Sequence, residues 1–479
     1  MRKILTHEEI IKNIDTYISN HAGKIKNVAK YRKFFKNLVG KHYRKRIIKN
    51  LRLKDEVAKW LNVDGTIKIG GLLTDEITID DIIVESTLPK AAINTLKTYS
   101  VGEAPYIDIN VIGTEKDWKK DFEIREKIHD KAKQLVEEML VTGNAFVKVE
   151  KGDNGKAEVI VLPVENVIII PDPKNISKVG AYIYFCELER DNPEIIGGKE
   201  KYKYIEIYQL DGKVFVYKGE QDNSPKEVDP TTNEINLHHV CGLEKDGLYG
   251  LSIYEGLETT FFEIVIRLTS NSYLFNKVNN PSMVGVGNIS KINNETGEQE
   301  VGTGEYTGFD NPDHANSLRY VEPPTSHVAT IYEHLKINMQ NAYSQLGINE
   351  IALGLSKEGN TASGEAFKKA ITSTLNKCRD ITTNLYIPLY NVYKQAYFIE
   401  EKGKLSFDII FKDGISLSEK EKIENETLQV VNKLLSRKSI LLNRGFTEDE
   451  AKKELETIKQ EENDLFGGVN ETIEEKDLD

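Results

Sequence analysis

Several residue patterns in the chain could support chemistry, but each lacks a part that the chemistry requires. A phosphate-binding loop needs Gly-x4-Gly-Lys-Ser/Thr at the start of a helix. Gly359 and Gly364 have this spacing, but Glu365 and Ala366 follow them. A carboxylate there would repel phosphates, and no hydroxyl is present to bind magnesium. Gly302-Thr303-Gly304 lacks the strand–turn–helix context of a dinucleotide site.

The remaining candidates for catalysis or metal binding are equally incomplete. His238-His239 is the only adjacent histidine pair. Neighbouring residues on a strand face opposite sides, and no third ligand stands at a recognisable spacing. No Gly-x-Ser-x-Gly motif occurs, and acid pairs such as Asp80-Asp81 and Glu137-Glu138 are typical of solvated faces. We therefore expect no enzymatic activity, no cofactor and no metal site.

The charge of the chain is unevenly distributed. Its 479 residues carry a net charge of −12, which argues against a simple DNA-binding protein that reads sequence, because such proteins are usually basic. Residues 1–60 nevertheless hold 17 Lys/Arg against 5 Asp/Glu. The densest basic cluster surrounds Tyr43 and comprises Lys41, Arg44, Lys45, Arg46 and Lys49. It is either a patch for nucleic acid or an acidic partner, or a solvated helix face that pairs with acids elsewhere in an assembly.

Other features of the sequence bear on the cellular compartment of the protein and on which part of the chain is disordered. The start of the chain, residues 1–9, has no apolar stretch behind its positive charges, so we expect no signal peptide. No uncharged apolar run approaches the roughly 20 residues of a membrane span. Cys186, Cys241 and Cys378 are odd in number and widely spaced, which predicts reduced thiols, mostly in the core, of an intracellular protein. Residues 461–479 hold eight acids and one lysine, which predicts a disordered tail.

Periodicity predicts a mixed α and β chain. The expected elements of the first half are helices over 7–60, a strand over 77–85, and helices over 86–99 and 123–141. A mostly antiparallel β region is expected over 145–240, with a hairpin turn at Asp211-Gly212.

The second half is expected to be mainly helical. A capping box at Ser252–Glu255 should begin a helix that runs to about Val278, where Pro281 stops it. After a glycine-rich insert, a second helix should run from Thr325 or Ser326 to about Leu346. The remaining expected elements are a loop over 347–362, a long helix over 363–401 with a kink at Pro388, a strand over 405–411, and helices capped at 416–419 and 447–450, the last ending near Asn463.

This order of elements resembles the portal proteins of tailed double-stranded-DNA bacteriophages, in particular the family typical of long non-contractile tails. Four motifs carry the resemblance, and their order and spacing cover some 270 residues. They are Tyr99-Ser100-Val101-Gly102-Glu103-Ala104-Pro105, which has one extra residue before the proline, Gly143-Asn144-Ala145-Phe146, Gly247-Leu248-Tyr249-Gly250-Leu251-Ser252, and Ser363-Gly364-Glu365-Ala366-Phe367-Lys368. The basic first 60 residues match no motif of the family.

The resemblance implies an α+β portal fold with a helical and β wing, a two-helix stem, a small α/β clip, a long kinked spine helix and a helical crown. It implies the following division: 1–249 wing, β-rich over 145–240; 250–278 first stem helix; 279–325 clip; 326–346 second stem helix; 347–362 tunnel loop; 363–413 spine helix and returning wing strand; 414–463 crown; 464–479 acidic disordered tail.

The resemblance also implies a ring, usually of twelve subunits, at one capsid vertex of a virion assembled in the host bacterial cytoplasm. Its protein partners would be the terminase large subunit, a head-completion or adaptor protein, the major capsid protein and a scaffolding protein. Double-stranded DNA would pass through the channel, and no membrane is implied. The implied positions are Asn349, Ser356, Lys357, Glu358 and Asn360 in the tunnel loop; Ser363, Gly364 and Glu365 at the start of the spine helix; Pro388 at its kink; and Asn288, Lys291, Glu305 and Tyr306 in the clip that docks partners.

A channel for moving DNA must not hold it, and twelve copies at −12 would repel a polyanion. Within the tunnel loop, Lys357 and Asn360 are the expected phosphate contacts. Two other classes stay open: another ring-forming component of a head, tail or portal-like particle, and a non-catalytic DNA-binding protein that acts through the basic N-terminus.

Overall fold

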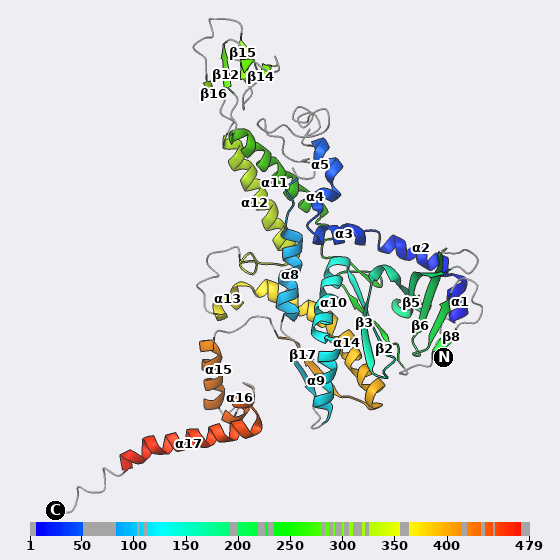
Figure 1. The fold of residues 1–479 in the computed structure, drawn as a ribbon, viewed down its shortest axis with the longest axis vertical. Helices are drawn as coiled ribbons and strands as arrows, with labels where there is room; N and C mark the ends of the chain where they lie inside the picture. The colour runs from blue at the N-terminus through cyan, green and yellow to red at the C-terminus, as the bar shows by residue number, and fades with distance from the viewer. Residues whose placement is uncertain are drawn as a thin grey trace, which may run out of the picture. The chain divides into compact units, whose positions relative to one another are not determined.

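Figure 1 shows the computed structural model of the chain, which divides into two compact units. The first unit comprises Met1–Thr361 and Lys369–Gly414, and the second comprises Ala362–Lys368 and Ile415–Asp479. The structure describes residues 6–50, 83–102, 106–109, 114–191, 199–218, 226–228, 234–279, 283–286, 291–292, 299–300, 306–309, 319–320, 325–354, 364–412, 419–432, 436–443 and 446–470.

The first unit opens with a series of short helices, as the sequence predicts for the described residues 7–50. These helices are α1 (His7–Lys12), α2 (Ile14–Lys24), α3 (Val28–Phe35), α4 (Val39–His42) and α5 (Arg44–Asn50). A capping box begins α1, because the Thr6 hydroxyl accepts from the Glu9 amide while the Glu9 carboxylate accepts from the Thr6 amide. Residues 51–60 lie outside the described part.

The next helices correct two expectations. The helix α8 (Leu88–Val101) is where the sequence predicts it, but the helix predicted over 123–141 is two helices, α9 (Thr114–Glu126) and α10 (Ile128–Thr142). They meet at Lys127, whose φ of 49° is incompatible with a continuous helix. Residues 83–85, the described end of the strand predicted over 77–85, are not in a strand.

Two antiparallel sheets confirm the β region. In the first, β2 (Asn144–Lys151) lies between β3 (Ala157–Leu162) and β9 (Leu237–Cys241). The short helix η1 (Val164–Asn166) leads from β3 to the second sheet. That sheet has the order β4 (Val167–Asp172), β5 (Asn175–Asp191), β6 (Lys199–Gln209), β7 (Val214–Lys218), β8 (Lys226–Val228). The predicted hairpin turn joins β6 to β7, and Gly212 supplies a φ of 85°.

The burial of β4 explains why its sequence is a continuous apolar run instead of an alternating one. Val167 and Ile169 pack with Phe146 of the first sheet, so the two sheets share a core. Ile168 and Ile170 belong to a separate cluster on the opposite face, where Ile10 of α1 is fully buried. The strand is thus covered on both faces, and the N-terminal helix supplies one of the two covers.

A pair of long antiparallel helices follows the sheets (Figure 1). These are α11 (Glu258–Asn279) and α12 (Thr325–Leu346), which pack against each other. The chain between them forms the strands β12 (Met283–Val286), β13 (Lys291–Ile292), β14 (Gln299–Glu300), β15 (Tyr306–Phe309) and β16 (Arg319–Tyr320), with β12 parallel to β15 and antiparallel to β16. Two further short strands, β10 (Lys245–Asp246) and β11 (Tyr249–Gly250), pair just ahead of α11.

The long helix predicted over 363–401 is interrupted. The structure has α13 (Gly364–Ala370) and α14 (Thr372–Glu401), separated by Ile371. The expected strand near residue 405 is β17 (Phe407–Ile410), and it pairs antiparallel with β1 (Tyr106–Ile109). Among the described helices, none is long and apolar enough to cross a membrane.

The second unit is helical in its described residues. Its helices include α15 (Glu419–Val431), α16 (Arg437–Asn443) and α17 (Glu448–Asn470). Thr447 and Glu450 form the predicted capping box of α17. This helix ends at Asn470 and not near Asn463, so the predicted disordered tail is helical up to residue 470. Residues 471–479 and the predicted cap at 416–418 lie outside the described part.

Candidate functional site: the base of the helical pair

Most of the residues that the sequence assigns to DNA or partner contact lie outside the described part. This holds for Ser356, Lys357, Glu358 and Asn360 of the loop, for Ser363 at the predicted start of the spine helix, and for Asn288 and Glu305 of the insert. Lys291 lies in β13 and Tyr306 in β15, while Gly364 and Glu365 begin α13. Of the five loop residues predicted to contact DNA, Asn349 is the one that the structure describes.

Asn349 fastens the turn after α12 to the start of α14. Its backbone N–H donates to Thr374 Oγ1 at 2.9 Å, and its side-chain Nδ2 donates to the Ala370 carbonyl at 3.0 Å. Its Oδ1 accepts from the Ile351 amide at 2.8 Å. The Ala370 carbonyl needs an outside donor because the helix is interrupted at Ile371. Both the nitrogen and the oxygen of the Asn349 side chain are therefore hydrogen-bonded within the chain. This favours a role in positioning the loop over contact with DNA.

Pro388 lies buried inside α14, and the helix continues past it to Glu401. The observed interruption of the long helix is at Ile371, seventeen residues earlier in the chain. The kink at Pro388 stays a prediction. Its two interpretations, a site of movement or a fixed bend around a ring, also stay open.

Two of the motifs that carry the portal resemblance meet in space, at the base of α11. Gly143 ends α10 with a φ of 88°, and its carbonyl accepts from the Gly242 amide at 2.7 Å. Asn144 then bonds Gly250 twice: its Nδ2 donates to the Gly250 carbonyl, and its Oδ1 accepts from the Gly250 amide. A Cβ on Gly250 would lie 2.0 Å from the Gly143 oxygen, so this approach requires glycine.

The predicted capping box at Ser252–Glu255 is wrong, because α11 begins at Glu258. The Ser252 hydroxyl is buried and donates to the Val141 carbonyl at 2.7 Å, near the end of α10. The intervening residues form turns, with Gly256 at a φ of 81°. Ser252 therefore fastens the entry of α11 to α10 instead of capping a helix.

Glu255 and Glu258 instead hold the N-terminal helix α3. The Tyr31 hydroxyl lies 2.5 Å from Glu255 Oε2 and 2.6 Å from Glu258 Oε1, and Lys30 Nζ lies 2.9 Å from Glu258 Oε1. Burial raises the pKa of Tyr31, and the two carboxylates raise it further. Burial also acts to raise the pKa of Glu258, but the hydrogen bonds from Tyr31 and Lys30 outweigh it and the pKa is lowered. The start of α11 is thus clamped between α10 and the N-terminal helices.

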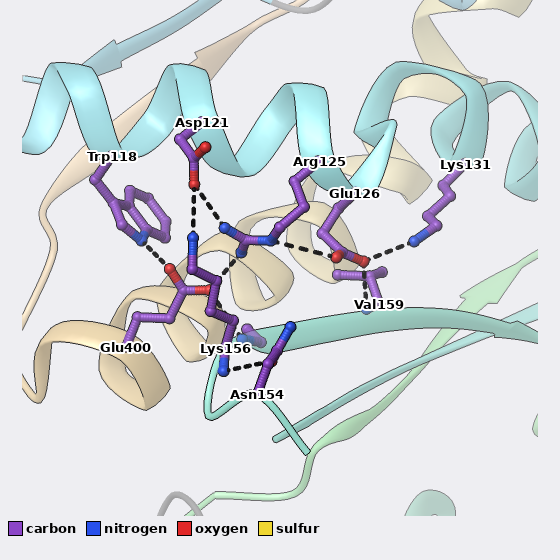
Figure 2. A network of polar contacts seen from close by, with 10 residues as sticks. Trp118, Asp121, Arg125, Glu126, Lys131, Asn154, Lys156, Val159 and Glu400 are labelled. Atoms are coloured by element: carbon purple, nitrogen blue, oxygen red, sulfur yellow. Dashed lines mark hydrogen bonds and ion pairs between the residues drawn. The ribbon is translucent and has the colours of Figure 1, made fainter. Parts of the chain in front are cut away.

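A second polar network fixes the other end of α14 (Figure 2). Glu400 accepts from Trp118 Nε1 at 2.8 Å and from the Ala157 amide at 2.8 Å, and it pairs with Arg125. These contacts join α14 to α9 and β3. The carboxylate is only 9% exposed, so it needs all three donors.

The same network explains the break at Lys127. Glu126 accepts from Lys131 Nζ at 2.9 Å and from the Val159 amide at 2.9 Å, as Figure 2 shows. Burial acts to raise the pKa of Glu126, but the hydrogen bonds from Lys131 and Val159 outweigh it and the pKa is lowered. The turn between α9 and α10 places this carboxylate over the edge of β3. The sequence carries no signal for this, because its apolar spacing continues through the break.

The histidine pair has ordinary internal partners. His238 Nε2 lies 2.9 Å from Gln395 Oε1 of α14, and His239 Nε2 lies 2.9 Å from Asn144 Oδ1. The His239 ring also stacks on Phe146. Burial lowers the pKa of His239 to about 3, with a further lowering by Lys245. Among the residues that the structure describes, no three His, Cys, Asp or Glu side chains gather as a metal site.

The three cysteines are free thiols, as predicted, although Cys378 alone is buried while Cys186 and Cys241 are partly accessible. A cavity of about 270 Å³ also lies at the base of the helical pair. Its lining combines apolar side chains with the polar groups of Glu244, Glu255, Gln345 and Lys377.

Comparison with known proteins gives structural matches alone. No family model and no curated protein matches the chain. A chain in the virion of a native gene transfer agent particle is 12% identical with a TM-score of 0.41, over 75% of this chain and 90% of that one. A chain in the neck of the native particle, computed with C12 symmetry, is 11% identical with a TM-score of 0.39, over 75% and 90%. A chain in the neck of the empty particle, computed with C6 symmetry, is 12% identical with a TM-score of 0.40, over 76% and 90%.

Proposed function

We propose that the chain is a portal protein, a subunit of a ring through which double-stranded DNA enters and leaves a phage-type capsid. The observation that carries this proposal is the helical pair α11 and α12. The first helix, α11, begins next to the β-rich part, at a base where two of the motifs that suggest the family are in contact. The second helix, α12, leads back into the loop before α13. In this pair, the chain between the two helices forms its own small strands. Such an arrangement would allow the helical pairs of neighbouring copies to pack side by side.

The surface of α12 supports side-by-side assembly. Leu335, Ala342 and Leu346 are buried in the core, while Tyr332 and Ile337 on other faces of the helix are 62% and 51% exposed. Contact with another protein would remove these two apolar side chains from water, which is favourable. In a ring, the neighbouring copy would cover it.

The net charge supports a channel that does not retain DNA. At −12 per subunit, a ring of twelve would carry a strongly negative total charge, so its average field would repel the phosphate backbone. The chain itself would have no enzymatic activity, and ATP hydrolysis would belong to the terminase. Residues 279–325 would dock the terminase and later the adaptor protein.

Negative-stain images of the purified full-length protein test the ring directly. We expect rings with a central hole and about the twelve subunits that the family resemblance implies. Particles that are only compact monomers, at every concentration and salt tested, would refute this architecture. A measured ATPase activity would contradict the absence of catalysis.

The channel loop is tested by substituting Lys357→Glu. We expect ring assembly to remain intact, because the substitution is directed at one predicted weak phosphate contact, whereas DNA packaged per particle should change. Packaging equal to that of the wild type would show that Lys357 does not contact DNA.

A further inference from the structure

The basic side chains of the N-terminal helices fall into two groups in the structure, according to whether they pair with acids. In the sequence no acid occurs between Asp15 and Asp55, so Lys24 and the cations of α3 to α5 have no acidic partner close by in the sequence. One group pairs with acids from later segments of the chain. Its members are Lys24 with Asp246 at 2.6 Å, Lys30 with Glu258 at 2.9 Å, and Arg32 with Glu138 and Glu165.

The second group forms what we call the lysine strip, Lys41, Lys45 and Lys49. These exposed side chains follow one another at intervals of four residues. Hydrogen bonds of the helical type, from the Tyr43 amide to the Val39 carbonyl and from the Ile47 amide to the Tyr43 carbonyl, continue across the junction of α4 and α5. The three lysines therefore lie along one side of a helical path about 12 Å long.

The opposite side of this path is fixed to α11. Ile47 is fully buried, the Arg46 guanidinium stacks on Phe262 at 4.2 Å from the ring centre, and Tyr43 meets the same ring. Glu85 accepts from the Gly40 amide and the Lys41 amide, so its carboxylate is bound to the start of α4. The anchored face holds the lysine strip outward.

Further cations lie near the start of the strip, where the Glu85 carboxylate is also bound. Lys33 and Lys36 of the same N-terminal segment are exposed. Burial lowers the pKa of His42, and the charges of Lys33 and Lys30 lower it further. Within the described chain, the lysines of the strip have no ion pair with an acid.

We propose that the lysine strip binds the phosphate backbone of duplex DNA, at a site separate from the loop over 347–362. Protein interfaces usually have aromatic or apolar anchors at their centre, but no large apolar side chain is exposed among the described residues 6–50. A face with cations and no anchors suits a phosphate backbone better than an acidic protein. Lysines that act as point charges would bind any DNA sequence.

This site does not depend on ring formation, because all its residues come from one chain. It also explains how a protein with a net charge of −12 can hold DNA at one place and repel it elsewhere. If the chain is a portal, the strip would give the packaged or entering genome a second point of contact.

Fluorescence anisotropy of the full-length protein with a DNA duplex of about 20 base pairs, over a series of salt concentrations, tests the proposal. The variant carries Lys41→Gln, Lys45→Gln and Lys49→Gln. The matched control carries Lys90→Gln, Lys151→Gln and Lys178→Gln, which removes the same charge from other exposed sites. Thermal unfolding of each protein verifies that it remains folded.

We expect the wild type and the control to bind with similar salt dependence. In the strip variant, the slope of log affinity against log salt should fall by about 3, since each lost phosphate contact removes about 0.9. Replacing the same three lysines by arginine should retain binding. Equal losses in the strip variant and the control would overturn the proposal, as would no binding of the wild type at low salt. If polyglutamate binds to the wild type and loses binding in the strip variant in the same way, the site would be one for an acidic protein instead.

Discussion

At the scale of single residues, three glycines decide how α10 meets the entry of α11. Gly250→Ala should destabilise the protein by about 3 kcal/mol, because the new Cβ would collide with backbone atoms of Gly143 and Gly242 that cannot move independently. Urea denaturation followed by tryptophan fluorescence measures the effect. Gly23→Ala is the control, since Gly23 lies in α2 with open space around it and should be neutral or slightly stabilising. Equal stabilities of the two variants would show that the junction relaxes freely.

Glu400 is the residue whose charge joins α14 to α9 and β3. Glu400→Gln should lower the free energy of unfolding by about 2–3 kcal/mol, because the amide accepts at one oxygen only and Arg125 Nη2 loses its charged partner, while Asp121 still pairs with Nη1. The shift in the denaturation midpoint gives the value. Glu401→Gln changes an exposed neighbour and should shift the midpoint by less than about 0.5 kcal/mol. Equal shifts would contradict the role of the network.

At the scale of elements, the proposed ring would use the exposed apolar side chains of α12. Substituting Tyr332→Ser together with Ile337→Ser should reduce the fraction of protein in rings, measured by analytical ultracentrifugation. It should leave the unfolding midpoint of the single chain nearly unchanged, because both side chains are already solvated. Ile176→Ser, which removes an even more exposed side chain from β5, is the control. Rings that persist in the double variant would place the subunit contacts on other elements.

At the scale of the whole molecule, histidines whose pKa is lowered in the folded chain should make stability depend on pH. Burial lowers the pKa values of His21, His42, His129, His238 and His239 from 6.5, so the unfolded chain binds more protons than the folded one below that pH. Stability should therefore be full above pH 6.5 and decrease as the pH falls below it, for His239 down to about pH 3.

Denaturation midpoints measured between pH 7.5 and pH 5 check this dependence. His239→Gln should show a smaller decrease across this range, even if it is less stable throughout. His334→Gln, at an exposed position on α12, should follow the wild type. A wild type whose stability is constant down to pH 5 would contradict the expected loss of stability in acid.

The sequence alone determined the succession of elements, because hydrophobic period, turn residues and caps act over a few residues. It located the β region, the turn at Gly212, the paired helices α11 and α12, and the capping box of α17. It also identified Gly143-Asn144 and Gly250 as motifs without indicating that they touch.

Only the tertiary structure decided where helices break and start. The interruptions at Lys127 and Ile371 and the late start of α11 depend on hydrogen bonds to partners distant in the sequence, such as Val159 for Glu126 and Asn349 for the Ala370 carbonyl. The structure likewise divided the basic N-terminus into lysines and arginines paired with distant acids and the outward lysine strip. A charge count cannot make that division, because the pairing depends on which surfaces the folded chain brings together.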